Sequence, residues 1–140
     1  MNAPLYTTEV LRLAASLAGP AQLEREDGFA EVRSPACGSR ITLTVQIDEA
    51  GKVAALSQRV HACAFGQASA ALMQRAAVGR DHEEVAEALT ALSGWLAGDR
   101  QDLGDWPGLD QLAAARSRRG RHGAILLPFR ALLAAIESAQ

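Results

Sequence analysis

The stretch Ile41-Thr42-Leu43-Thr44-Val45-Gln46-Ile47, with the turn Asp48-Glu49-Ala50-Gly51 and the run from Lys52 to Ala62 behind it, decides the fold. Residues 41–47 alternate strictly between apolar and polar side chains, which is typical of a strand with one buried face. Gly51 can adopt positive φ, so residues 48–51 are predicted to form a turn. Residues 52–62 would then return as the second strand of an antiparallel hairpin.

Working outward from the hairpin, the upstream sequence predicts one more strand and one helix. The strand contains Phe29 and Val32. A short helix before it can be capped by Thr7 or Thr8, and Gly19-Pro20 would stop it. The chain is therefore expected to begin with a helix that is followed by three strands.

Downstream of the hairpin the apolar spacing changes to that of helices. The first of these helices is predicted to end at Gly79, and Asp81 with Glu84 has the spacing of a capping box that begins the next. A short helix over 109–115 and a longer last helix follow. Pro128 is expected in the first turn of the last helix, because proline is tolerated there.

This order of elements predicts an α+β fold, in which helices pack on one face of a three-stranded antiparallel sheet. The chain has 140 residues, of which 49% are hydrophobic. That is enough to bury a core, so we expect a single domain spanning residues 1–140.

Composition excludes several classes of function. The net charge of −2 gives no footprint for nucleic acid. No stretch approaches the roughly 20 apolar residues of a membrane span, and the N-terminus lacks a signal-peptide pattern, so a cytoplasmic location is expected. With two cysteines and no export signal, metal binding or thiol chemistry is expected rather than a disulfide framework.

Both cysteines lie where the chain is predicted to change direction. Cys37 is in the turn Pro35-Ala36-Cys37-Gly38-Ser39, and Cys63 lies where a strand gives way to a helix, whose dipole would favour the thiolate. His61 would share a strand face with Cys63 if the strand extended that far. Each cysteine alone is more often inert packing. Two cysteines do not establish a metal site, because one zinc needs three or four protein ligands.

A histidine lies at the start of the predicted last helix, beside a group of arginines. His122 begins the segment His122-Gly123-Ala124, and the arginines are Arg116, Arg118, Arg119 and Arg121. By itself such a run is a weak patch for an anion or a partner protein. A histidine beside it most often belongs to a solvated basic loop, so neither feature identifies a site alone.

Four blocks of sequence resemble the NifU/IscU/SufU family. Ser34-Pro35-Ala36-Cys37-Gly38-Ser39, before an alternating strand, looks like the family's P-x-C-G-D segment. His61-Ala62-Cys63-Ala64-Phe65-Gly66-Gln67-Ala68-Ser69-Ala70-Ala71-Leu72-Met73 is similar to its G-C-x-x-(S)-x-A-S-x-S-x-(L/M) block. Val78-Gly79-Arg80 matches its G-(K/R) stop, and the sequence from His122 to Ile136 resembles its last helix. The chain is identified as a divergent member of this family of scaffold and sulfur-relay proteins.

Family members use three cysteines and an aspartate, sometimes with a histidine, to hold zinc, iron or a nascent [2Fe–2S] cluster. The resemblance implies that Cys37 and Cys63 match the first two cysteines, whereas Ser39 stands at the aspartate position. The third cysteine is absent. It would fall at Gly123 if His122 matches the histidine of the family's H-C motif, or at Ala124 if the R-x-K-C motif is the better match.

The resemblance therefore implies a metal set of Cys37, Cys63 and His122. Its additional ligands would be His61 and Ser39, and its partner-binding residues Arg119 and Arg121. The cargo would be iron or a [2Fe–2S] cluster, with zinc as the alternative.

The function that this implies is a scaffold or carrier rather than an enzyme. It would accept sulfur from a cysteine desulfurase and serve downstream iron–sulfur acceptor proteins, without nucleic acid or membrane; a homodimer is left open. One alternative is an adaptor or regulator of the desulfurase that binds no metal. A SufU-like, zinc-dependent sulfurtransferase is a second alternative, although its acceptor cysteine and aspartate are both missing.

Overall fold

The computed structural model describes residues 6–35 and 38–140 of the chain. Its strands are β1 (Gly28–Arg33), β2 (Arg40–Ile47) and β3 (Val53–His61). Its helices are α1 (Thr8–Ala15), α2 (Ala64–Ala77), α3 (His82–Ala97), the 3-10 helices η1 (Leu109–Ala115) and η2 (Arg119–Arg121), and α4 (His122–Ser138). Within the described residues the strands form one antiparallel sheet in the order β1-β2-β3, so the predicted α+β fold is confirmed.

The hairpin of β2 and β3 forms where the alternating stretch predicts it. Gly51 has a φ of 80° in the connecting turn. Asp48 closes this turn, because its carboxylate accepts hydrogen bonds from the backbone N–H groups of Ala50 and Lys52 at 2.9 and 3.0 Å. The hydrogen bonds of Asp48 and the positive φ of Gly51 therefore stabilise the turn that reverses the chain.

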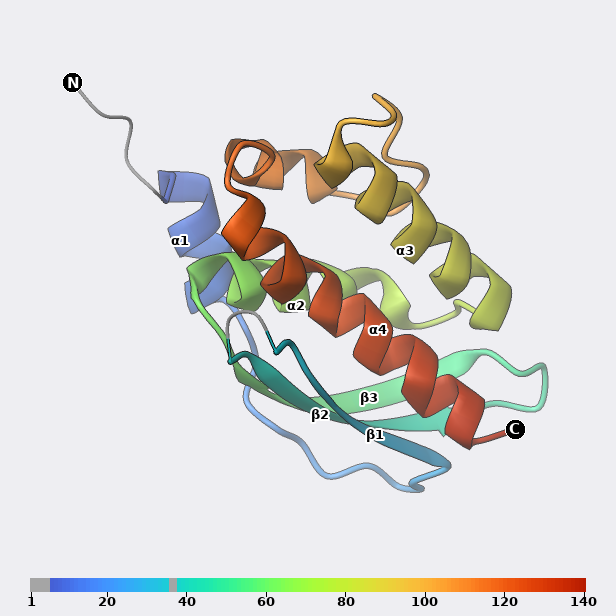
Figure 1. Cartoon of the computed structure of the whole chain (residues 1–140). Coiled ribbons are helices and arrows are strands. Elements are labelled where there is room, and N and C mark those ends of the chain that lie inside the picture. Colours follow the sequence, from blue (N-terminus) through green and yellow to red (C-terminus); the bar gives the residue numbers. More distant parts are fainter. Residues whose placement is uncertain (1–5, 36–37) are drawn as a thin grey trace.

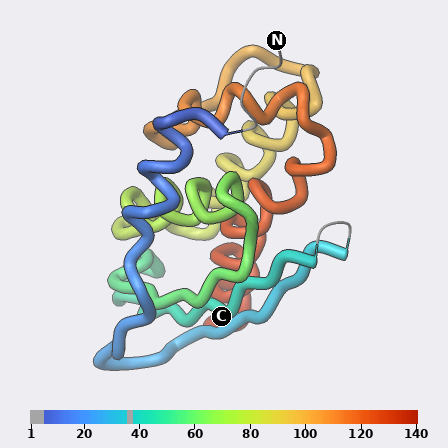
Figure 2. The backbone as a smooth tube through the Cα atoms, turned by 90° about the vertical axis from the view of Figure 1, so that its left-hand side faces the viewer, coloured from blue at the N-terminus to red at the C-terminus, as the bar shows by residue number. Residues whose placement is uncertain are grey.

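Helices cover one face of the sheet (Figure 1). Ile41, Leu43 and Val45 of β2 point toward this face and are fully buried. Helix α4 lies across β1 and β2, while α2 lies against β3. Figure 2, turned by 90°, shows the sheet along one side of the molecule and the helices on the other. The predicted packing of helices on one face is thus confirmed.

Local capping signals set two of the helix starts. Thr7 is the N-cap of α1, but the helix ends at Ala15, before the predicted stop at Gly19-Pro20. Asp81 and Glu84 form the complete capping box predicted for α3, since each side chain accepts a hydrogen bond from the other residue's backbone N–H. Both helix starts depend on hydrogen bonds between residues three positions apart, so they can be recognised from the local sequence.

Pro128 was expected in the first turn of the last helix, and this prediction is wrong. Helix α4 begins at His122, so Pro128 lies inside it. Proline has no N–H to donate to the carbonyl of Ala124, four residues earlier. That carbonyl faces Gly66 of α2, where an added Cβ would lie 3.2 Å from the Ala124 oxygen. The proline is therefore accommodated where a neighbouring helix approaches closely.

The core lies between the sheet and the helices and extends toward both chain ends. The Tyr6 ring, before α1, is 5.0 Å from the ring of Phe65 between centroids. The Trp106 ring packs edge-on against Phe129 of α4, with centroids 5.1 Å apart. Among the described residues, none of the helices combines the length and the apolar character needed to cross a membrane.

Candidate functional site

Strand register brings the predicted site segments to one end of the sheet. Arg33, the last residue of β1, pairs with Arg40, and Arg40 pairs with His61, the last residue of β3. The described residues of the turn 34–39, which joins β1 to β2, therefore lie at the same end as the chain that leads from β3 into α2. Cys63 is in that connection, two positions beyond His61.

Cys63 is the N-cap residue of α2. Its backbone is extended, with φ of −66° and ψ of 174°, its side chain makes no capping hydrogen bond, and the free thiol is half-buried. Since β3 ends at His61, the strand does not reach Cys63. The condition for a shared strand face is thus not met. His61 is exposed and alternates with Val60, whose partner Ile41 is buried, so His61 lies on the sheet face away from the helices.

His122 is the first residue of α4, and its ring has a fixed orientation. Its Nε2 lies 2.8 Å from the carbonyl oxygen of Ala115 and 3.2 Å from that of Arg116. A carbonyl can only accept, so Nε2 carries the proton. In the neutral ring the lone pair is then on Nδ1. The ring is therefore half-buried and fixed by hydrogen bonds, and it is not part of a solvated loop.

The acceptor carbonyls are themselves held in place. Arg116 donates from Nε to the carbonyl of Trp95 at 3.0 Å, and its guanidinium lies 4.8 Å from the centroid of the Trp95 ring. This anchors the segment after η1 to the end of α3. Of the arginines before α4, Arg116 therefore has a structural role, because it positions the loop that orients His122.

Ser34 links the turn 34–39 to the start of α4. It is 4% exposed; its N–H donates to the Ser39 carbonyl at 2.9 Å, and its own carbonyl accepts from the N–H of Gly38 at 3.0 Å. A Cβ built on Gly123 would lie 2.6 Å from Ser34 Oγ. The base of the turn therefore touches α4 where the helix has no side chain. Sequence reasoning missed Ser34, because nothing local signals a contact with position 123.

The first turns of α2 and α4 lie side by side, as Figure 1 also shows. The Ser69 hydroxyl donates a buried 2.6 Å hydrogen bond to the carbonyl of Ile125. A Cβ on Gly66 would lie 2.6 Å from Ala62 Cβ and 3.2 Å from Ala124 Cβ, so glycine permits this approach. Cys63 and His122, at the starts of these two helices, are thus brought to the same end of the molecule as the turn 34–39.

Comparison with known protein families agrees with this arrangement. The family described as the NifU-like N terminal domain matches residues 5–100. The chain belongs to this family. The match ends before α4, so the segment that carries His122 lies outside the matched residues.

Solved structures extend the NifU-like likeness over nearly the whole chain. A nitrogen-fixing NifU-like protein (N-terminal) from Brucella abortus has a TM-score of 0.87 at 29% identity, covering 96% of this chain and 94% of that one. FiSufU from Fervidobacterium islandicum AW-1, assigned as an iron–sulfur cluster assembly scaffold protein for the SUF system, has a TM-score of 0.80 at 22% identity, covering 94% and 96%. At 22% identity the second likeness shows the fold alone. No curated protein matches the chain.

The structure distinguishes the two positions where a NifU-like third cysteine would fall. Ala124 is fully buried, with 0% exposure. Gly123 is half-buried and borders Ser34, the first residue of the segment 34–39. A side chain at 123 would therefore approach the turn, whereas one at 124 would enter the contact between α2 and α4.

Two of the predicted ligands, Cys37 and Ser39, come from the sequence segment 34–39. Cys37 lies outside the described residues, so its role stays a prediction. Ser39, at the aspartate position of the family, is 4% exposed, and its carbonyl accepts the Ser34 N–H. Within residues 6–35 and 38–140 no three His, Cys, Asp or Glu side chains gather as a metal-binding group. The predicted set includes Cys37, so this result does not test it.

Basic residues border this end of the molecule. Arg33, Arg40 and His61 stand opposite one another across the three strands, on the face away from the helices, and we call them the basic row. Arg119 is exposed and Arg121 half-buried in η2, directly before His122. Arg33 pairs with Glu31 at 3.2 Å. Basic side chains therefore flank the segments that converge on two sides, at the strand ends and in η2.

Proposed function

We propose that the chain is an iron–sulfur cluster assembly scaffold, a binding protein whose cargo is iron or a nascent [2Fe–2S] cluster. The observation that carries the proposal is the convergence of Ser34, Cys63 and the start of α4 at one end of a NifU-like fold. In this proposal Cys37 and Cys63 supply thiolates and His122 supplies a ring nitrogen. Thiolates and imidazoles are the groups that hold such clusters in proteins.

The held ring of His122 supports its assignment as a ligand. Metal-binding histidines commonly donate their second ring N–H to a carbonyl, which fixes the tautomer and the ring orientation. Nε2 of His122 already donates to Ala115, so Nδ1 is the nitrogen that would bind iron. His61, exposed on the outer sheet face, is proposed only as an additional ligand, together with Ser39.

The sulfur of the cargo is proposed to come from a cysteine desulfurase, and the completed cluster to pass to downstream acceptor proteins. The basic row together with Arg119 and Arg121 supports a docking surface beside the site. Charged rims of this kind mainly set the rate and selectivity of association.

A second candidate function is an adaptor of the desulfurase that binds no metal. The observation that favours it is the contact between Ser34 and Gly123, because the Ser34 hydroxyl occupies space that a side chain at position 123 would need. Zinc bound by two cysteines and a histidine would instead favour the SufU-like sulfurtransferase alternative.

Metal and sulfide analysis after anaerobic purification tests these functions. We expect the wild-type protein to contain iron with sulfide and to show a charge-transfer absorption spectrum. Cys63→Ser and His122→Ala should each lower metal affinity by at least about tenfold, since each removes a proposed ligand. His82→Ala is a matched control, because His82 pairs with Glu137 on α4 at 3.0 Å, far along the fold from His122.

Full metal occupancy in His122→Ala with loss in Cys63→Ser would show that His122 is not a ligand. Wild-type protein free of iron, zinc and sulfide, yet able to bind the desulfurase, would establish the adaptor. Zinc without sulfide, together with stimulated desulfurase turnover, would establish the sulfurtransferase.

A further inference from the structure

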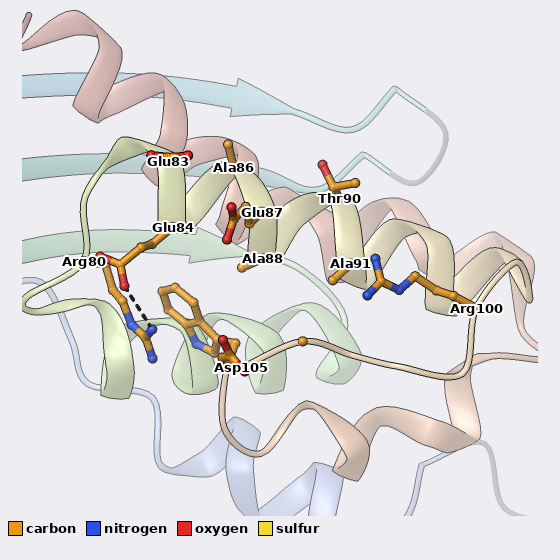
Figure 3. A pocket seen from close by; sticks show the side chains of 12 residues that line it. Arg80, Glu83, Glu84, Ala86, Glu87, Ala88, Thr90, Ala91, Arg100 and Asp105 are labelled. Carbon is orange, nitrogen blue, oxygen red and sulfur yellow. Dashed lines mark ion pairs between the residues drawn. The ribbon is translucent and has the colours of Figure 1, made fainter.

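A cavity of about 500 Å³ lies between α3 and the segment that follows it (Figure 3). We call it the α3 groove; its lining includes Arg80, Glu87, Ala88, Ala91, Asp105 and Trp106. Cavities of roughly 300–1,000 Å³ are typical of binding sites. Neither Cys63 nor His122 lines it, so it is separate from the proposed cluster site.

The α3 groove has an apolar floor made of small residues. Ala88 and Ala91 are buried on the groove side of α3. Gly104, with φ of 77°, lies so close that an added Cβ would be 3.3 Å from Ala91 Cβ. These small residues let the segment follow the helix closely, and they give the groove an apolar floor.

The indole of Trp106 forms one wall, and its face already holds a cation. Its Nε1 donates to the Leu72 carbonyl at 3.1 Å, which fixes the ring. The guanidinium of Arg80 lies 4.8 Å from the ring centroid. Cations are attracted to an indole face by the ring quadrupole.

The arginines of the groove are already engaged, whereas several carboxylates are not. Arg80 pairs with Glu84 at 3.5 Å, as Figure 3 shows, and Arg100 pairs with Asp102 at 3.3 Å. In the described part of the chain, no ion pair is formed by the remaining lining carboxylates, which are Glu83, Glu87 and Asp105. The rim of the groove therefore has a surplus of negative charge above an apolar floor.

We propose that the α3 groove docks a lysine- or arginine-bearing segment of a partner protein. The methylene stem of such a side chain would lie along Ala88 and Ala91, and its charged head would reach Glu87 and Asp105. This charge complementarity commits the groove to a basic protein segment. The proposal is independent of cluster binding, because it uses no residue of the cluster site.

Tryptophan fluorescence of the full chain tests this proposal. The variant Trp95→Phe leaves Trp106 as the reporter. The probe is an acetylated, amidated hexapeptide of alternating lysine and alanine, with glutamine replacing lysine in the neutral control peptide. We expect saturable binding of the lysine peptide that weakens at least tenfold in Glu87→Gln/Asp105→Asn and in Ala91→Leu. Glu49→Gln, an exposed acid in the β2–β3 turn, should change nothing.

Several results would overturn the proposal. Equal binding of the neutral peptide, undiminished binding in Glu87→Gln/Asp105→Asn, or no binding of the lysine peptide would each do so. Saturable binding of spermidine without binding of the peptide would assign the groove to a small polyamine instead. Because the glutamine and asparagine replacements are isosteric and exposed, they test the charge without depending on the bulkier Ala91→Leu.

Discussion

The contact between Ser34 and Gly123 couples two residues at one corner of the proposed cluster site. Ser34 is 4% exposed, and a Cβ at position 123 would lie 2.6 Å from its Oγ, so a side chain there must displace the hydroxyl. A thiol at 123 would nevertheless be directed toward Ser34, the first residue of the segment 34–39. The two positions should therefore be changed together rather than singly.

This coupling gives a prediction for restoring a third thiolate. We expect Gly123→Cys alone to lower the free energy of unfolding by about 1–3 kcal/mol, the usual cost of overpacking. Ser34→Ala/Gly123→Cys should recover most of that loss. It should also bind zinc more tightly than Ser34→Ala alone, because it adds a thiolate ligand. Urea unfolding and competition with a chromophoric chelator measure the two effects.

Ala124→Cys is the control for position. Ala124 is fully buried against α2, so a thiol there should reduce stability without increasing zinc affinity. A gain in zinc affinity from Ala124→Cys, and none from Ser34→Ala/Gly123→Cys, would show that position 124, and not 123, can supply a third metal ligand.

At the scale of elements, the sequence predicts features that depend on neighbouring residues, but not features that depend on contacts between distant segments. The capping box of Asp81 and Glu84 was predictable, because both partners lie within one helical turn. The start of α4 was predictable as well, because the sequence places Arg121-His122-Gly123-Ala124 at the start of the last helix. The place of Pro128 inside that helix was not, since it depends on the close approach of Gly66, which no local pattern shows.

The start of β1 is joined to the end of β2 by a polar clasp. Asp27, which precedes β1, accepts a 2.7 Å hydrogen bond from the N–H of Ile47, and Arg25 binds both the Asp27 carboxylate at 2.8 Å and the Ile47 carbonyl at 2.7 Å. The hydrogen bond from Arg25, followed by that from Ile47, holds the pKa of Asp27 below its ordinary value of 3.8. The folded state therefore favours the charged carboxylate.

This clasp predicts a pH dependence of stability. Because the folded-state pKa is lowered, the contribution of Asp27 is present above pH 3.8 and is lost as the pH falls through the lower, folded-state value. The difference in free energy of unfolding between wild type and Asp27→Asn should thus shrink as the pH is lowered in a series of urea unfolding curves. A difference that grows on acidification would contradict this. Glu49→Gln, in the exposed hairpin turn, should show no such trend.

At the scale of the molecule, more of the fold than of the candidate site could be predicted from the sequence. Alternation in 41–47 and the helical spacing after it contain enough information for a sheet covered on one face, since both periods are local. The convergence of Cys63 with His122 instead depends on strand register and on the contact of α2 with α4. The sequence could place Cys63 at a helix start, but it could not show that Ser34 meets Gly123.

The basic row predicts opposite effects of one substitution on stability and on partner binding. Arg40 stands directly opposite Arg33 across the sheet, and like charges in opposite positions destabilise a sheet. Arg40→Glu should therefore raise the free energy of unfolding by about 0.2–1 kcal/mol at low salt, while it slows association with the proposed desulfurase and reduces the salt dependence of that association. Urea unfolding and association kinetics at several salt concentrations measure both effects.

Arg130→Glu, exposed on α4, is the charge-matched control and should leave association unchanged. If Arg40→Glu stabilises the fold but leaves association unchanged, the row is not a docking surface. If Arg40→Glu and Arg130→Glu slow association equally, net charge rather than the row controls binding.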